Sequence, residues 1–399
     1  MLNTLPGESI DCVITSPPYW GLRSYSTNGQ VWGGASECDH SFNTEIKKGW
    51  VGHGGHGSNS KEVFDDTFAR NGTEHGFCDC GAWCGELGLE PTFQLYIEHL
   101  QTIFDEVYRV LKKTGTCWVD IGDTYSNANN DTAPTKSLCN IPHRFAISMT
   151  DNGWIQRNTI IWHKPSCMPS SAKDRFTVDF EYVFLFTKNK KYYFEQQFEA
   201  YNDESIKRAQ RELNGKGYKE PYKLDRNKDY NSNTDAVVKS LQKIASGDNR
   251  GRNKRTVWRI NPQPFKDAHF AVFPEKLVEP MIKAGCPSAI CDSCGYAFEH
   301  NYNFKYETAR NGVTDKYRQD AESRVKRRSI INDVKSRDTY KQIKKCNCDS
   351  TTHAGIVLDP FVGSGTTALV ARKLGRHYIG IDLNADYVTM ANKRLSEVL

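Results

Sequence analysis

The sequence predicts an α/β fold built around a doubly wound, mainly parallel β-sheet, and three observations lead to this fold class. Residues 356–382 read as strand, Gly-rich turn, helix, strand and acidic residue, the order found in the nucleotide-binding half of such a sheet. Residues 10–15 form a short, mostly apolar run that stops at a pair of prolines, as a buried strand does. Residues 93–112 repeat apolar side chains at helical spacing and lead into an apolar strand at 117–121.

The size and composition of the chain are those of a globular protein. Its 399 residues can form one large domain with insertions, or two domains. Hydrophobic residues make up 38% and the mean hydropathy is −0.65, so the chain is polar but still able to fold. No apolar run approaches the ~18 residues that span a bilayer, and the N-terminus lacks the features of a signal peptide. We therefore expect a cytoplasmic protein with no membrane partner.

The positive charge is unevenly distributed. The net charge is +5, yet residues 205–260 contain fifteen lysines and arginines against six acidic residues. A second basic run lies at 324–345. Clustered positive charge is the electrostatic footprint of a nucleic-acid partner, although a solvated, flexible face has the same composition.

The other elements are predicted from local patterns in chain order. Residues 26–90, rich in Gly, Ser, Asn and His, form a loop-like insertion with little periodicity. The helix over 93–112 ends at the stop signal Lys112-Lys113-Thr114-Gly115. Further helices are expected at 141–151 and 274–284, and further strands at 155–162 and 182–188.

The second half of the chain alternates polar insertions with apolar elements. Residues 200–257 are polar and basic with no clear core signal, and 288–354 form a cysteine-bearing insertion. Residues 356–358 and 378–381 read as buried parallel strands, with a helix over 366–374 between them.

The turn after the first of these two strands is suited to binding a nucleotide-like ligand. Gly363 and Gly365 allow the backbone to approach a ligand closely and to turn sharply into the start of a helix. Asp382 follows the next strand, 23 positions after Asp359, and this spacing suits a carboxylate that accepts both hydroxyl groups of a ribose.

Two motifs together carry a resemblance to a known family. Near its start the chain reads Thr15-Ser16-Pro17-Pro18-Tyr19-Trp20, and near its end Leu358-Asp359-Pro360-Phe361-Val362-Gly363-Ser364-Gly365-Thr366-Thr367. The first resembles the catalytic tetrapeptide of enzymes that methylate an exocyclic amine of a DNA base. The second resembles the S-adenosylmethionine (SAM) loop of the same enzymes. With the catalytic motif first, the chain resembles the beta group of DNA amino-methyltransferases over roughly residues 8–25, 87–190 and 256–399.

This resemblance implies a Rossmann-like methyltransferase sheet that is circularly permuted, since the catalytic half precedes the SAM half. It also implies insertions for target recognition and zinc binding. The expected parts are the catalytic half at 1–25 and 87–165, a loop-rich Cys/His insertion at 26–86, the target-recognition region at 166–260, the SAM-binding half at 261–287 and 355–399, and a basic, zinc-ribbon-like insertion at 288–354.

The resemblance also assigns roles to residues. The Ser16 hydroxyl oxygen and the Pro17 carbonyl would accept hydrogen bonds from the target amine, because its lone pair must be drawn back onto nitrogen. Pro17 and Pro18 would fix the backbone, and Tyr19 would stack on a base flipped out of the duplex. Phe361 would line the SAM pocket. The expected SAM site comprises Asp359, Pro360, Phe361, Gly363, Ser364, Gly365, Thr366, Thr367 and Asp382, with Thr366 and Thr367 capping the helix.

The expected activity is site-specific methylation of double-stranded DNA, at cytosine N4 because position 16 is Ser. Adenine N6 enzymes more often have Asp at that position, and N6 methylation stays an alternative. An RNA methyltransferase and a DNA-binding homologue with impaired catalysis are further alternatives. Cytosine C5 chemistry is disfavoured, because no proline in the chain is followed by the nucleophilic cysteine that it requires.

The family context brings further expectations. Members usually have a strand and a Gly-Asp turn, which contacts the SAM adenine, ahead of the catalytic strand. Only nine residues precede Ile10, too few for this element. Either the start of the chain is truncated or misassigned, or SAM binding is weakened. The resemblance is compatible with a homodimer, with a cognate restriction enzyme, and with a prokaryotic or phage-encoded origin.

Cysteines predict a structural zinc site in the basic insertion. Thirteen cysteines in a chain expected to be cytosolic favour metal ligands over disulfides. Cys291 and Cys294 form one close pair, and Cys346 and Cys348 form another. Two such pairs supply the four thiolates of a tetrahedral zinc site, although four ordinary reduced cysteines are the alternative.

A second set of candidate ligands lies in the first insertion. Cys38 and His40 form one pair, and Cys78 and Cys80 form another. A zinc ion there would hold a loop that otherwise lacks a core, with Cys84 as a competing ligand. With four protein ligands at each site, the zinc would be structural.

Overall fold

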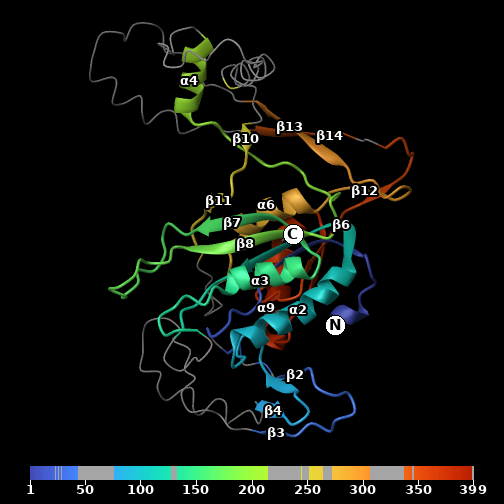
Figure 1. Ribbon diagram of the computed structural model, residues 1–399. Helices are drawn as coiled ribbons and strands as arrows, with labels where there is room; N and C mark the ends of the chain where they lie inside the picture. Colours follow the sequence, from blue (N-terminus) through green and yellow to red (C-terminus); the bar gives the residue numbers. More distant parts are fainter. Residues whose placement is uncertain are drawn as a thin grey trace, which may run out of the picture. The chain divides into compact units, whose positions relative to one another are not determined.

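The structure is a computed structural model (Figure 1). It describes residues 1–22, 24–25, 27, 29–43, 76–126, 133–213, 244, 251–263, 272–305, 337–343 and 346–397. The chain divides into two units, which are described separately. The first comprises Met1–Glu195, Thr256–Ala297 and Cys348–Leu399, and the second Gln196–Arg255 and Phe298–Asn347.

A seven-stranded sheet forms the centre of the first unit. Its order is β11 (Val257–Arg259), β7 (Ile155–His163), β8 (Phe180–Thr187), β6 (Leu111–Ile121), β1 (Ile10–Thr15), β16 (Ile356–Asp359) and β17 (His377–Gly380). Only β8 runs antiparallel to its neighbours within this sheet. The predicted Rossmann-like α/β class is therefore confirmed, whereas the circular permutation stays a prediction.

Helices cover both faces of this sheet because its central strands are apolar on both sides. In β1, Val13 packs with α2 (Phe93–Val110) and α3 (Ile141–Asp151). Cys12 and Ile14 point to the other face, where they pack with α6 (Glu275–Gly285) and α8 (Thr366–Lys373). The last helix, α9 (Ala385–Ser396), follows β17 and packs on α8.

The predicted boundary between the first long helix and its strand is wrong. Helix α2 ends at Val110, and β6 begins at Leu111, six residues before the predicted strand. Leu111 is fully buried and pairs with Ile10 of β1, so tertiary packing draws the basic segment after it into the sheet. The other predicted helices and strands of this unit lie within two residues of their observed bounds.

Strand β17 differs from its predicted environment. It is parallel to β16 as predicted, but it is an edge strand with half-buried or exposed residues and not a buried one. No described strand pairs with its outer edge. Before β1, the described residues contain the 3-10 helix η1 (Leu2–Thr4).

The first insertion contains regular structure, contrary to the prediction of a loop. Strands β2 (Gln30–Trp32), β5 (Trp83–Gly85), β4 (Gly76–Cys78) and β3 (Phe42–Asn43) form a small antiparallel sheet in that order. The strands are only two or three residues long, too short for alternation to be visible in the sequence. Residues 44–75 of the predicted loop lie outside the described residues.

The two ends of the second insertion lie in the first unit and form a short strand pair. It consists of β12 (Ile290–Cys291) and β15 (Thr352–His353), which are antiparallel.

The second unit is built from small pieces. Helix α4 (Asp203–Leu213) lies between β9 (Phe198–Glu199) and β10 (Arg252–Asn253), which pair with each other. Strands β13 (Glu299–Lys305) and β14 (Arg337–Ile343) form a hairpin. Most of both predicted basic runs lies outside the described residues. Of the helices that the structure describes, none has the length and apolarity to cross a membrane.

Candidate active site

Asp359 joins the two sequence motifs. It ends β16 and is almost completely buried, with 1% of its surface exposed. Its Oδ1 accepts hydrogen bonds from the Thr15 hydroxyl at 2.6 Å and from the Phe361 backbone N–H at 3.1 Å, and its Oδ2 accepts one from the Thr367 hydroxyl at 2.7 Å. Burial raises the pKa of Asp359 to about 6 despite these donors. One carboxyl group therefore holds the end of β1 against the Gly-rich loop and the start of α8.

The Gly-rich loop requires glycine for two different reasons. Gly363 and Gly365 both have positive φ, +49° and +83°. A Cβ on Gly365 would also lie 2.7 Å from the Cβ of Ala391 in α9. The loop can thus turn into α8 only with glycine at position 365.

The predicted capping of α8 by threonines is wrong. Gly365 is the N-cap, with no side-chain cap. The Thr367 hydroxyl donates to Asp359 instead, and the Thr366 hydroxyl accepts from Arg394 at 3.1 Å. Because the N-cap residue is glycine, no capping side chain satisfies the first backbone N–H groups of α8.

Asp382 lies beside this loop after β17. Its Oδ2 accepts a hydrogen bond from the Gly363 N–H and its Oδ1 one from the Asn384 N–H, both at 2.9 Å. The remaining lone pairs of a half-buried carboxylate suit the ribose hydroxyls that the sequence assigned to it. The residues that the sequence assigned to SAM therefore converge at the carboxyl ends of β16 and β17. Pro360 and Ser364 are buried within the same loop.

The tetrapeptide Ser16-Pro17-Pro18-Tyr19 follows β1 directly. The Ser16 hydroxyl donates to the Tyr19 hydroxyl oxygen at 3.5 Å, which leaves the lone pairs of Ser16 Oγ as acceptors. Pro17 is buried, and the Pro18 carbonyl accepts from the Tyr96 hydroxyl of α2 at 2.7 Å. That bond occupies the Pro18 carbonyl, not the Pro17 carbonyl to which the sequence assigned a catalytic role.

Tyr19 is held in place by Glu181 of β8 and by Gly122, which follows β6. Its hydroxyl donates to Glu181 Oε2 of β8 at 3.1 Å, and Glu181 is ion-paired with Lys164, which follows β7. The ring lies against Gly122, where a Cβ would come within 2.5 Å of it. Burial and the carboxyl groups of Asp120 and Glu181 raise the pKa of Tyr19 well above its ordinary value of 10, so the phenol keeps its proton.

Asp120 adds a buried carboxyl group to this corner of the sheet. It lies near the end of β6 with 4% of its surface exposed, and Oδ1 has no hydrogen-bond partner among the described residues. Burial, and then the charge of Glu181, raises its pKa well above the ordinary value of 3.8. This shift favours the neutral carboxyl group, the form in which Asp120 can act as a hydrogen-bond donor.

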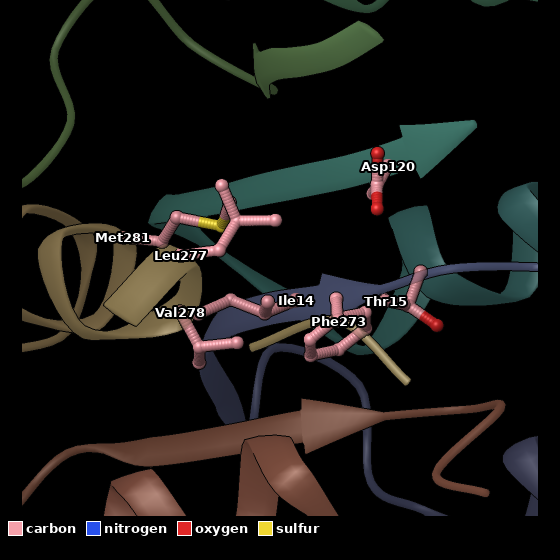
Figure 2. Close-up of a pocket in the computed structure, with 7 residues that line it drawn as sticks. All are labelled: Ile14, Thr15, Asp120, Phe273, Leu277, Val278 and Met281. Carbon is pink, nitrogen blue, oxygen red and sulfur yellow. The ribbon is translucent and has the colours of Figure 1, made fainter. Parts of the chain in front are cut away.

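Asp120 lines a small pocket whose other walls are mostly apolar. Figure 2 shows Thr15 and Asp120 at one end of the pocket and Met281 of α6 at the other. The remaining lining residues, Ile14, Phe273, Leu277 and Val278, are all apolar.

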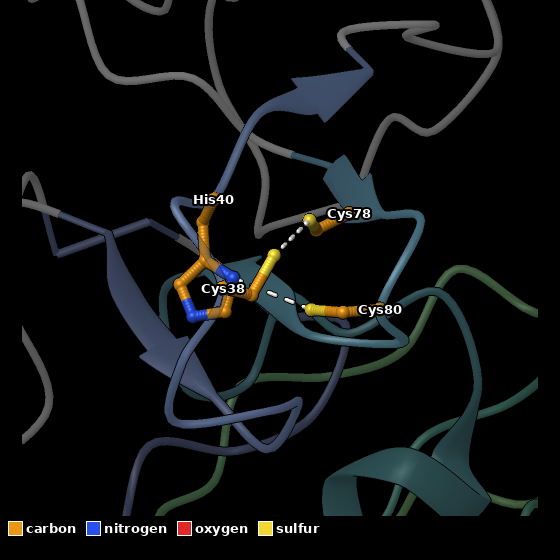
Figure 3. A group of neighbouring side chains, drawn as sticks. All are labelled: Cys38, His40, Cys78 and Cys80. Carbon is orange, nitrogen blue, oxygen red and sulfur yellow. Dashed lines mark hydrogen bonds between the residues drawn. The ribbon is translucent and has the colours of Figure 1, made fainter.

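The first predicted metal cluster is assembled in the small four-stranded sheet. Cys38 and His40 precede β3, Cys78 ends β4, and Cys80 lies in the turn before β5 (Figure 3). Their ligand atoms all lie within 4.8 Å of one another. The two sulfur atoms of Cys38 and Cys78 are 3.7 Å apart, and Cys80 Sγ is 3.3 Å from His40 Nδ1. The structure thus brings together the four residues that the sequence selected, without Cys84.

The second predicted cluster is assembled at least in part. The sulfur atoms of Cys291, Cys294 and Cys348, all in the first unit, lie within 4.8 Å of one another. Cys291 ends β12, and Gly295 closes the turn by donating its N–H to the Cys291 carbonyl at 2.9 Å. Cys346 belongs to the second unit, and its place in the site stays a prediction.

A family comparison agrees with the geometry at the ends of β1 and β16. A family model described as DNA methylase, for N6 and N4 methyltransferases, matches residues 10–289 and 300–393. The chain belongs to this N6/N4 DNA methylase family. The predicted resemblance is thereby confirmed, and the chain is a SAM-dependent DNA methyltransferase whose substrate is DNA.

Type II methyltransferases are similar to the chain, and two of them match nearly its whole length. The Type II methyltransferase M.XycI of Xanthomonas campestris pv. cyanopsidis is 27% identical, covering 99% of this chain and 84% of the relative. M.Cfr9I of Citrobacter freundii has the same identity and coverage. M.MwoI of Methanothermobacter wolfeii is 39% identical, but over only 47% of this chain and 19% of the relative.

Solved structures of similar proteins were also found. The PvuII DNA methyltransferase, described as cytosine-N4-specific, is 16% identical, covers 98% of this chain and 82% of its own, and has a TM-score of 0.46. TTHA0409 of Thermus thermophilus, a putative DNA modification methylase in complex with SAM, is 15% identical, with coverage of 99% and 89% and a TM-score of 0.41.

Three residues of this methylase site were not assigned roles from the sequence. Asp120, Lys164 and Glu181 all lie at the edge of the sheet where β1, β6 and β7 end and the antiparallel β8 begins. One sequence feature could have pointed to Asp120. It is the single charged residue in the apolar strand 117–121, where uncharged residues are expected. No sequence signal could pair Lys164 with Glu181, because the pairing depends on the antiparallel contact of β7 with β8.

Proposed function

We propose that the chain methylates cytosine N4 in duplex DNA at a specific sequence. The observation that carries the proposal is the position of Ser16 beside Tyr19 at the end of β1, next to Asp359 and the SAM loop. Ser at position 16 favours cytosine N4 over adenine N6. Adenine N6 methylation is the second candidate, because Ser16 and the Pro17 carbonyl are neutral acceptors that either amine can use.

The proposed mechanism rests on the residues around Ser16. An exocyclic amine is a weak nucleophile because its lone pair is delocalised into the ring. The Ser16 oxygen and the Pro17 carbonyl accept hydrogen bonds from the two N–H groups of the amine. In the transition state these bonds localise the lone pair on nitrogen, where it can attack the methyl group. Tyr19, held by Glu181, provides the ring against which a flipped base stacks. In its neutral form, which burial favours, Asp120 can donate a hydrogen bond to an acceptor on that base.

The cofactor would be held by residues of the loop after β16. The backbone of Gly363 and Gly365 approaches it, Phe361 lines the pocket and Asp382 takes the ribose hydroxyls. Bound SAM supplies the methyl group. Direct transfer to the target nitrogen is proposed, with no covalent enzyme intermediate, and the amine releases one proton to solvent as it gains the methyl group.

Target recognition and biological context are proposed as well. Residues 166–260 are proposed to recognise the sequence, because the basic excess of 205–260 lies there. The relatives named above are Type II methyltransferases, which supports a role in a restriction–modification system. Zinc is proposed at both cysteine clusters. Its role would be structural, because the four protein ligands that the sequence offers at each cluster would leave no open position for catalysis.

The deciding experiment is product analysis. Purified protein is incubated with SAM and mixed-sequence duplex DNA, and the digested nucleosides are separated by mass spectrometry. N4-methylcytosine is the expected product. N6-methyladenine would support the same mechanism with adenine as the target base in place of cytosine. Methylation of RNA alone would reject DNA as the substrate. Neither product, together with no SAM binding by calorimetry, would support the catalytically impaired homologue.

A further inference from the structure

The cluster of Cys38, His40, Cys78 and Cys80 has distances that match zinc coordination. A tetrahedral site with Zn–S of about 2.3 Å and Zn–N of about 2.0 Å places two sulfurs roughly 3.8 Å apart and a sulfur and a nitrogen roughly 3.5 Å apart. The observed Cys38–Cys78 and Cys80–His40 separations are 3.7 and 3.3 Å. Figure 3 shows the four side chains directed toward a common point.

The backbone around the cluster is shaped to hold it. The Gly81 N–H donates to the Cys78 carbonyl at 2.8 Å, which closes a tight turn between two ligands. Gly34, with a φ of +80°, passes so close that a Cβ there would lie 2.9 Å from Cys80 Sγ. Only a few short strands otherwise stabilise this sheet, so a metal would supply what its small core cannot.

The same small sheet contacts helix α2 through stacked rings. Trp32 of β2 stacks on His99 with centroids 4.4 Å apart, and Trp83 of β5 does so at 5.3 Å. His99 is buried and its Nδ1 lies 2.9 Å from Glu90 Oε1. Trp83 is three residues from Cys80, so two of the metal ligands, Cys78 and Cys80, share the β4–β5 hairpin with one of the stacked rings.

Glu90 then contacts the loop that contains the catalytic residues. Its Oε2 accepts from the Gly88 N–H at 2.8 Å, and its carbonyl accepts from Trp20 Nε1 at 2.9 Å. The Gly88 carbonyl accepts from the Gly21 N–H at 2.8 Å. A Cβ on Gly88 would lie 3.1 Å from the carbonyl of Tyr19, so the two segments are in direct contact.

From these contacts we propose that Cys38, His40, Cys78 and Cys80 bind one zinc ion whose role is to position the catalytic loop. Zinc fixes the β4–β5 hairpin, the hairpin fixes the ring of His99, and His99 with Glu90 fixes residues 16–22. His99 and Glu90 are positioning residues. The effect on methyl transfer rests on the proposed function, whereas the metal site and the loop order do not.

The metal site is tested by counting zinc in purified full-length protein with inductively coupled plasma mass spectrometry. Cys80→Ser is expected to lose one zinc per chain relative to the wild type. Cys84→Ala, in the same sheet but outside the cluster, should keep it, and Cys294→Ser should lose zinc only from the other cluster. Equal zinc content in the wild type and Cys80→Ser would overturn the site, and loss in Cys84→Ala would assign the ligand to Cys84.

The positioning role is tested by amide hydrogen exchange, which does not require activity. Zinc removal by a chelator, or Cys80→Ser, should speed exchange at residues 16–22 and 86–90 by about tenfold or more, and added Zn²⁺ should restore the chelated protein. Helix α8 should exchange at its original rate. Glu90→Gln should keep its zinc and still loosen the loop. Uniformly faster exchange would mean general destabilisation, and an unchanged loop would reject positioning.

Single-turnover kinetics then connects the loop to the reaction. With saturating SAM and DNA, Cys80→Ser and Glu90→Gln should slow methyl transfer while the SAM dissociation constant stays within about threefold. A proportional loss of SAM binding would contradict a specific effect on residues 16–22. If wild-type protein methylates no DNA, the proposed function fails, while the zinc and exchange results still decide the metal site and its effect on the loop.

Discussion

At the scale of the residue, the Ser16 hydroxyl is the group to which the proposed mechanism assigns the most direct chemical role. Ser16→Ala removes an acceptor that matters most in the transition state, so methyl transfer should slow on the order of 100-fold. SAM and DNA dissociation constants should change little, because the ground-state contacts remain. Single-turnover rates and equilibrium binding measure the two effects separately.

Ser9→Ala, at the other end of β1, is the matched control and should behave as the wild type. An unchanged transfer rate in Ser16→Ala would remove Ser16 from the mechanism.

Asp359 makes a prediction about pH. Its pKa is raised by burial from 3.8 to about 6, so the folded state binds an extra proton between these values. Its contribution to stability is therefore fully present below pH 3.8 and is lost as pH rises through 6. Relative to Asp359→Asn, which cannot titrate, the wild-type free energy of unfolding should fall across this window. Urea denaturation at several pH values measures the difference.

Asp386→Asn, an exposed carboxyl group in the first turn of α9, provides the comparison for a carboxyl group without these contacts. Parallel stability curves for the wild type and Asp359→Asn would show that burial does not perturb Asp359.

At the scale of the element, the junction of the Gly-rich loop with α8 should tolerate no Cβ at position 365. Gly365→Ala combines a positive φ with a 2.7 Å approach to Ala391, so α9 must shift. We expect a loss of roughly 1–3 kcal/mol in stability together with weaker SAM binding. Thermal unfolding and calorimetric SAM titration measure both.

Gly375→Ala is a close control, since Gly375 has a φ of +67° but nothing within 4 Å of a Cβ. It should cost stability from backbone strain alone and leave SAM binding intact. Equal effects of the two substitutions would show that the approach to Ala391 is unimportant.

Most elements of the large sheet could be predicted because their side chains alternate or repeat over several residues. The failures have physical causes that are not local. Leu111 starts a strand because it pairs with Ile10, about a hundred positions away. Thr367 does not cap its helix because Asp359, eight positions earlier, takes its hydroxyl. The four-stranded sheet is held by pairings between segments too short to carry a pattern.

The candidate site was predictable to the extent that it lies in contiguous motifs. Ser16, Gly365 and Asp382 could be selected from the sequence because each stands at a fixed place relative to a strand or turn. Lys164 and Glu181 acquire their role only from the antiparallel contact of β7 with β8. That pairing depends on the whole sheet, so no local pattern contains it.

At the scale of the whole molecule, the basic second unit should govern the salt dependence of DNA binding. Lys207 and Arg208 are exposed on α4. Replacing both with Ala should weaken DNA binding and reduce the slope of log affinity against log salt by up to about 2, since each phosphate that the protein neutralises contributes roughly 0.9. SAM binding should not change. Fluorescence anisotropy at several salt concentrations measures the slope.

Lys393→Ala, an exposed charge in α9 of the first unit, is the control and should leave the slope unchanged. An unchanged slope in the double variant would place the DNA contacts elsewhere than α4.

The position of β1 has a consequence for how the protein is made. One edge of this central strand pairs with β6, but the other pairs with β16, about 340 residues further along the chain. During translation, β1 leaves the ribosome long before β16 exists, so its hydrogen-bonding edge has no native partner until the last residues are synthesised. Nascent chains that stop before Ile356 should therefore depend on chaperones and be more prone to aggregate than the full-length chain.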